Sequence, residues 1–139
     1  MSYLRGMMRL RDKTTTLTMD QSYALVMLTV KWCEKFFTPP AVKRRTSLSV
    51  MVYNNINRRV YGQYCERNNW MTINIIMCNN VKDIIKTTIH EYTHFSQDLK
   101  EYALMNKKVG YDNNPFEIEA RFNEDTYYTN CWRSIKNKI

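Results

Sequence analysis

The segment His90-Glu91-Tyr92-Thr93-His94 combines the residue types of a zinc site at a helical spacing. Residues four apart lie on the same face of a helix, one turn apart, so two imidazoles can point at one ion. Zinc binds imidazole nitrogens at about 2.0–2.1 Å. Glu91 lies about 100° round the helix from His90, where its carboxylate can take a proton from a zinc-bound water without ligating the ion. The segment therefore predicts two metal ligands and a general base within one helical turn.

The composition of the chain supports this prediction. His90 and His94 are the only histidines, and none of the four cysteines forms a C-x-x-C pair. The alternative is that two surface histidines flank an ordinary glutamate. If the zinc prediction holds, a catalytic ion needs a third protein ligand beside an open position for water. That third ligand is expected to be a carboxylate, and Glu117 and Glu119 are the two downstream candidates.

Glu117 is preferred over Glu119 for a packing reason. Ala120 lies one turn after Glu117 on nearly the same helix face. A small side chain there lets two helices approach closely enough for Glu117 to reach the ion. Glu119 instead shares its face with Phe122 and Asn123. Both carboxylates could also be solvated residues that favour a helix N-terminus, so Glu119 stays an alternative ligand.

The combined pattern resembles a known family. His90-Glu91-x-x-His94 followed by Glu117-x-x-Ala120 looks like the gluzincin metallopeptidases, in which a glutamate on a later helix is the third zinc ligand. The fuller pattern is similar to small HExxH proteins of bacteria and phages, and it adds Gln97, Tyr111, Pro115 and Glu119. The resemblance covers roughly residues 81 to 125. The chain departs from the long gluzincin pattern at Arg121, where that pattern has an aspartate.

The resemblance implies an activity and a site. It implies a zinc-dependent metallopeptidase that holds one Zn²⁺ with His90, His94 and Glu117 and hydrolyses peptide bonds with a water activated by Glu91. Tyr111, in the loop before the ligand helix, is the expected hydroxyl donor to the oxyanion, although it could equally pack or cap that loop. Glu124, two turns after Glu117 on the same face, is a weaker candidate to accept a hydrogen bond from a ligand imidazole. Gln97, one turn after His94, is a weaker candidate for a hydrogen-bond donor near the site; each could also be ordinary polar surface.

The elements that must position these residues follow from local signals. Thr18 and Gln21 have the form of a capping box, which predicts a helix from residue 18 that ends before Pro39. Alternating apolar residues predict strands at 48–53, 60–65 and 70–77, joined as an antiparallel meander. A helix capped by Asn80 is expected to run to about residue 108, with Gly110 after it. A last helix is expected over 115–136, with Asn114 as its N-cap.

The length of 139 residues predicts a single domain. The expected helices and strands make it an α+β domain with a basic N-terminal arm at residues 1–17, and the resemblance to gluzincins implies a minimal zincin-like fold. No secretory signal or apolar stretch of membrane-spanning length is visible, so a cytoplasmic protein that contacts no membrane is expected. The partner is expected to be a protein or peptide substrate. The net charge of +8 also fits a polyanionic partner, but the basic residues are scattered without a nucleic-acid motif, so nucleic acid is not favoured.

Three alternatives stay open from the sequence. The chain could be a zinc-binding or regulatory protein of the same fold without activity. It could be a basic, nucleic-acid-associated accessory protein in which the motif is incidental. It could also be a regulatory protease that cuts a single partner.

Overall fold

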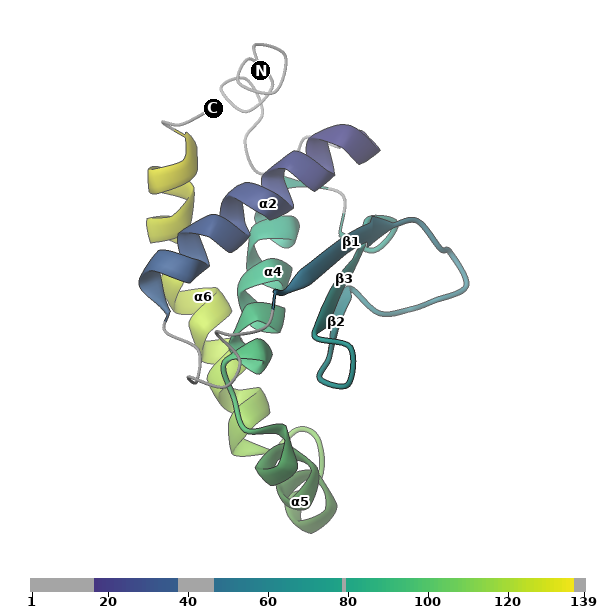
Figure 1. The fold of residues 1–139 in the computed structure, drawn as a ribbon, viewed down its shortest axis with the longest axis vertical. Coiled ribbons are helices and arrows are strands. Elements are labelled where there is room, and N and C mark those ends of the chain that lie inside the picture. Colours follow the sequence, from purple (N-terminus) through teal and green to yellow (C-terminus); the bar gives the residue numbers. More distant parts are fainter. Residues whose placement is uncertain (1–16, 38–46, 79, 137–139) are drawn as a thin grey trace.

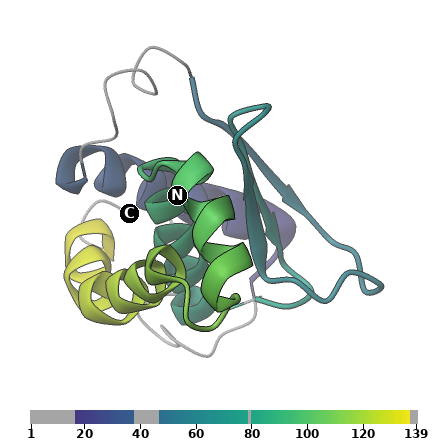
Figure 2. The ribbon, with the colours of Figure 1, turned by 90° about the horizontal axis from the view of Figure 1, so that it is seen from below.

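The computed structural model describes residues 17–37, 47–78 and 80–136. These residues form four helices and three strands. In chain order they are α2 (Met19–Phe36), β1 (Ser49–Tyr53), β2 (Gly62–Cys65), β3 (Trp70–Asn74), α4 (Val81–Phe95), α5 (Leu99–Val109) and α6 (Pro115–Lys136). Helices α2, α4 and α6 pack together, and the sheet stands to one side of them (Figures 1 and 2). The predicted α+β class is confirmed. The predicted basic arm lies outside the described residues, apart from Leu17, which is buried in the core.

Helix α2 begins where the sequence predicts. The Thr18 hydroxyl accepts a hydrogen bond from the Gln21 backbone N–H at 3.2 Å, and the Gln21 side chain accepts one from the Thr18 N–H at 2.9 Å. This reciprocal pair satisfies two N–H groups that a helix start leaves without partners. Leu25, Val26 and Cys33 on this helix are buried in the core, and α2 packs against α4 beside α6.

The sheet is mixed, so the predicted antiparallel meander is wrong. Strand β3 lies in the centre, antiparallel to β2 and parallel to β1. The tight turn at residues 66–69, with Asn69 at φ 49°, makes β2 and β3 neighbours. The longer connection at residues 54–61 places β2 beyond β3. The physical reason is burial, because Met71 and Ile73 of β3 are fully buried and the central strand is the best covered.

The expected single helix from Asn80 to Lys108 is also wrong, because it is two helices. Asn80 caps α4 as predicted, accepting from the Asp83 N–H at 2.9 Å. The helix then ends at Phe95, and Asp98 begins α5 by accepting from the Lys100 N–H at 3.0 Å. The break turns the chain so that α5 extends from one end of the molecule (Figure 1). Gly110 ends α5 with a positive φ, 83°.

Helix α6 starts as predicted, and its cap also anchors α5. The fully buried Asn114 accepts from the Phe116 N–H at 3.0 Å through its Oδ1 atom. Its Nδ2 atom donates to the Tyr102 carbonyl of α5 at 3.0 Å. One side chain therefore sets both the start of α6 and the place of α5 beside it.

The connection between β1 and β2 is held by one buried amide, which the sequence analysis did not identify. Asn74 is fully buried at the end of β3. Its Nδ2 atom donates to the carbonyls of Asn55 and Arg58 at 3.1 and 2.8 Å, and its Oδ1 atom accepts from the Asn55 N–H at 3.2 Å. The end of this connection forms one wall of the candidate site, so Asn74 supports that wall from behind.

None of the described helices is both long and apolar enough to cross a membrane. All four cysteines lie in the described part of the chain and carry free thiols; Cys33, Cys78 and Cys131 are buried and Cys65 is half-buried. Three of the four cysteines therefore serve as small apolar core residues.

We expect Asn74→Ala to lower the free energy of unfolding by about 1–3 kcal/mol, because it leaves buried carbonyl and N–H groups without partners. Urea unfolding followed by circular dichroism measures the change. Asn54→Ala is the matched control, since Asn54 is exposed one residue before this connection's anchored part, and it should change stability by less than about 0.5 kcal/mol. Equal effects of the two substitutions would contradict the assigned role of Asn74.

Candidate metal centre

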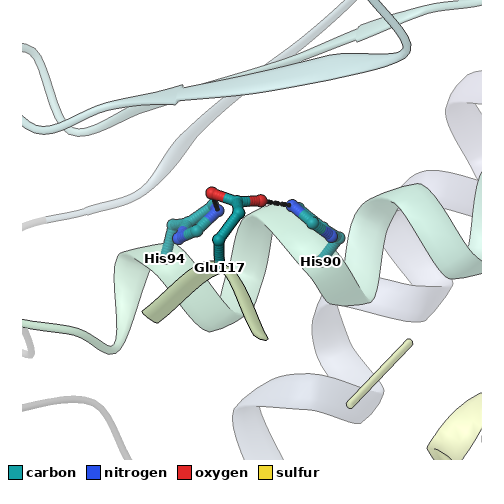
Figure 3. A group of neighbouring side chains, drawn as sticks. All are labelled: His90, His94 and Glu117. Carbon is teal, nitrogen blue, oxygen red and sulfur yellow. Dashed lines mark hydrogen bonds and ion pairs between the residues drawn. The ribbon is translucent and has the colours of Figure 1, made fainter. Parts of the chain in front are cut away.

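Helix α4 presents both histidines to one carboxylate of α6. The Nε2 atom of His90 lies 2.7 Å from Oε1 of Glu117, and the Nε2 atom of His94 lies 3.1 Å from Oε2 of the same residue. Figure 3 shows the Glu117 carboxylate between the two imidazoles, above the α4 axis. The candidate ligand atoms of the three residues all lie within 4.8 Å of one another. The structure therefore brings together the three residues predicted as ligands.

The second nitrogen of each imidazole faces away from this carboxylate and has a partner of its own. The Nδ1 atom of His90 lies 2.7 Å from Oε1 of Glu124. The Nδ1 atom of His94 lies 2.7 Å from Oε1 of Gln97. Acceptors at Nδ1 keep the proton on that atom and leave the Nε2 lone pair for a cation, the arrangement found around protein metal ions.

The direction of the Gln97 amide is itself determined by neighbours. Its Nε2 atom donates to the Phe116 carbonyl at 2.8 Å and to the Glu119 carboxylate at 2.7 Å. Because the Phe116 carbonyl and the Glu119 carboxylate are both acceptors, the Gln97 atom that faces them must be the NH₂ nitrogen. The carbonyl oxygen of Gln97 must therefore face His94. Glu119, the alternative ligand in the sequence analysis, thus lies behind Gln97 and is absent from the His90–His94–Glu117 cluster.

Glu117 is enclosed by donors from three parts of the chain. Its side chain is 1% exposed, and besides the imidazoles it accepts from the Tyr102 hydroxyl at 2.8 Å and the Tyr111 hydroxyl at 3.1 Å. Burial alone raises the pKa of this carboxyl, but the hydrogen bonds from His90 and His94 outweigh it and hold the pKa well below its usual range. Glu117 is therefore an anion at neutral pH, as a metal ligand must be.

The metal-free cluster keeps a proton on His90. Burial lowers the pKa of His90, yet the hydrogen bonds to Glu117 and Glu124 outweigh it and raise this pKa to about 10. Both ring nitrogens then donate, one to each carboxylate. In this state the proton on Nε2 stands where a cation would bind, and it neutralises part of the buried negative charge.

The donor set fits zinc. Two imidazole nitrogens and one carboxylate are a known set of catalytic zinc ligands. In this structure both Nε2 atoms converge on one buried carboxylate, and both Nδ1 atoms have fixed acceptors. A tetrahedral ion with bonds of about 2.0–2.1 Å needs donors roughly 3.3 Å apart, and the candidate ligand atoms of the three residues lie within 4.8 Å of one another.

A cleft of about 330 Å³ opens beside the cluster. One wall is the segment from Arg59 to Gly62, the floor is α4, and Tyr111 and Glu124 close the far side. Gly62 permits this arrangement, because a Cβ atom there would lie 2.7 Å from the Thr87 methyl and 3.2 Å from Cγ of Glu91. The start of β2 thus packs directly on the helix that carries the histidines.

Glu91 lines this cleft and is 7% exposed. No hydrogen bond or salt bridge of its carboxylate is found within the described residues. Burial raises the pKa of Glu91, while His90 and His94 lower it in part. A carboxylate with a raised pKa and no partner is suited to accept and return a proton.

Some site residues were not found by sequence reasoning. Tyr102, on α5, donates to Glu117 although the expected continuous helix would have carried it away from the cluster. The signal that could have revealed Tyr102 is Asp98, a residue type favoured at helix N-caps, which begins a new helix after α4 has ended at Phe95. Arg121 donates to the Asp112 carbonyl at 2.8 Å, so it ties the loop that carries Tyr111 to α6.

Comparison of the chain with protein-family models, curated proteins and solved structures finds no match. The resemblance to gluzincins accordingly depends on the motif residues alone, and a functional proposal depends on the geometry of the cluster.

We expect zinc binding to strengthen as pH rises. Because the pKa of His90 is about 10 in the metal-free protein, zinc must displace one proton at neutral pH, whereas the ionised Glu117 releases none. The apparent Kd should fall about tenfold for each pH unit between pH 6 and 9. Competition with a fluorescent zinc chelator at each pH measures this slope, and a pH-independent Kd would contradict the protonated His90.

Proposed function

We propose that this protein is a zinc-dependent metallopeptidase of the zincin type. The observation that carries the proposal is the convergence of the Nε2 atoms of His90 and His94 on the buried Glu117 carboxylate, with the unpaired Glu91 facing the adjoining cleft. A cluster with a purely structural role would not need an unpaired carboxylate, that of Glu91, in the same turn of helix.

Zinc would be held by Nε2 of His90, Nε2 of His94 and the Glu117 carboxylate. When bound, the ion supplies Lewis acidity and lowers the pKa of a water molecule. Glu124 and Gln97 keep the two imidazoles oriented by accepting their Nδ1 protons at 2.7 Å. Glu117 stays ionised because its neighbours stabilise the charged form.

Glu91 acts as the general base and then the general acid. Its carboxylate takes the proton of the attacking water and passes it to the amine that leaves when the peptide bond breaks. The raised pKa of Glu91, caused by burial, brings its proton affinity closer to that needed at neutral pH. Gly62 packs against one side of Glu91, because a Cβ atom there would lie 3.2 Å from Cγ of Glu91.

In this proposal Tyr111 donates a hydrogen bond to the developing oxyanion. The Tyr102 hydroxyl, like that of Tyr111, donates to the Glu117 carboxylate. Burial and the nearby Glu117 raise the pKa of Tyr111 to about 12, so its hydroxyl keeps its proton at neutral pH and can donate. Its ring is largely exposed, which leaves the hydroxyl free to turn from Glu117 toward a substrate oxygen.

Strand β2 offers a place for an extended peptide. It lies at the edge of the sheet, and Tyr61 uses its carbonyl to accept from the Asn74 N–H at 2.8 Å. Because backbone groups alternate in direction along an antiparallel strand, those of Gly62 point to the open edge. A peptide added there would run beside His90 and Glu91, as in other recognition by strand addition.

We expect the purified protein to carry one zinc ion per chain, and His90→Ala and Glu117→Ala to carry none. Each substitution removes one of three ligands from a site that leaves a position open for water. Metal analysis by mass spectrometry after dialysis measures the content. Glu119→Ala is the matched control and should keep the ion, because Glu119 lies outside the cluster and the Phe116 carbonyl still accepts from the Gln97 amide. Zinc-free wild type, or zinc kept by both ligand variants, would overturn the proposal.

We expect Glu91→Gln to keep its zinc and to lose hydrolysis of a peptide library by at least about 100-fold, because the amide cannot accept the proton. Product peptides quantified by mass spectrometry measure the rate, with the zinc content of both proteins as the control. A zinc-loaded wild type that cleaves no peptide would identify a zinc-binding protein without peptidase activity.

A further inference from the structure

Arg59 contributes an unpaired cation to the cleft beside Glu91. Its exposed side chain lines the same 330 Å³ cleft as His90 and Glu91. No hydrogen bond or salt bridge of Arg59 is found among the described residues. A guanidinium with five donors at the rim of a catalytic cleft is available to a ligand.

The preceding residue, Arg58, provides a contrast within the same segment. Its side chain lines a different hollow, on the outer face of the sheet with Met51 and Trp70. There it donates to the Gln63 side chain at 2.5 Å. The two arginines therefore have similar sequence positions and charge, but only Arg59 faces the candidate site.

The carboxylates of the cleft do not neutralise Arg59. Glu124 accepts from the Nδ1 atom of His90 at 2.7 Å, and Glu91 is buried at the floor. The free charge at the rim is positive, as is the net charge of the whole chain, +8. An anionic ligand would thus be attracted at long range and paired at short range.

We propose that the substrate is an acidic peptide segment, in which an Asp or Glu side chain close to the bond to be cut pairs with Arg59. This inference rests on the proposed peptidase function and names its substrate class. Arginine binds carboxylate through two parallel N–H···O bonds, which fix direction as well as position. A peptide extended along the edge of β2 would place a side chain against Arg59 at the beginning of the wall.

A peptide fits this cleft better than a nucleic acid does. Nucleic-acid binding relies on contacts to several phosphates in succession. Among the described residues that line the cleft, Arg59 is the single Lys or Arg, and Glu91 and Glu124 line the same cleft. These carboxylates would repel a run of phosphates but leave room for one carboxylate on an otherwise neutral chain.

The test measures binding separately from hydrolysis. Fluorescent, end-blocked peptide pools carry either Glu or Gln at one central position among neutral residues. Their binding to zinc-loaded Glu91→Gln protein is followed by fluorescence anisotropy. We expect the Glu pool to bind about tenfold tighter than the Gln pool. The preference should disappear when Arg59→Ala is added and remain when Arg58→Ala is added instead. Arg59→Glu should reverse it in favour of a Lys pool.

Several outcomes would overturn the inference: equal binding of the two pools, no binding of either, or a preference that survives Arg59→Ala. Displacement of the Glu pool by a single-stranded oligonucleotide at lower concentration than by unlabelled peptide would assign the cleft to nucleic acid instead. Failure of the proposed peptidase function would give a different result from failure of this inference. If the Glu pool binds through Arg59 but zinc-loaded wild type does not cut it, the acidic-peptide site stands and the peptidase assignment falls.

Discussion

The burial of the Glu117 carboxylate is the constraint on which the rest of this site depends. An ionised carboxylate that is 1% exposed is strongly destabilising unless charged or polar donors surround it. Here the donors come from α4, from Tyr102 of α5 and from the loop at Tyr111. The side chain of Ala120, fully buried one turn later, is small enough for α4 and α6 to approach. The contacts between these elements therefore follow from one charge that has to be compensated.

Compensation of charge would not by itself orient the imidazoles, and a further set of hydrogen bonds does so. Gln97 accepts from His94 with its carbonyl oxygen because its NH₂ group donates to the Phe116 carbonyl and to Glu119. For Gln97 to point inward, α4 has to end just before it, at Phe95. The helix break that sequence analysis missed is thus part of the site, since a continuous helix would have directed Gln97 and Tyr102 elsewhere.

The features that were predicted correctly depend on neighbours in sequence. Capping by Thr18, Asn80 and Asn114 and the shared face of His90 and His94 need only a few residues of context. Glu117, which was preferred over Glu119, is the carboxylate that lies beside the two histidines, and the small Ala120 one turn away on its helix face is the local signal that favoured it. The order of the strands was mispredicted because it depends on which strand the helices bury. Asn74 and Tyr102 were missed because their partners are 15 to 19 residues away.

The placement of the sheet decides from which side the cluster can be reached. Among the three clustered residues, only His90 lines the cleft, together with Glu91, whereas His94 and Glu117 do not. A ligand must therefore approach from the side of His90, along the wall that Asn74 supports and Gly62 brings against α4. The proposed base and Arg59 both face this approach. In the proposed function, a substrate that enters here would meet the exposed Arg59 before it reached the buried Glu91, so selection by charge would precede any chemistry.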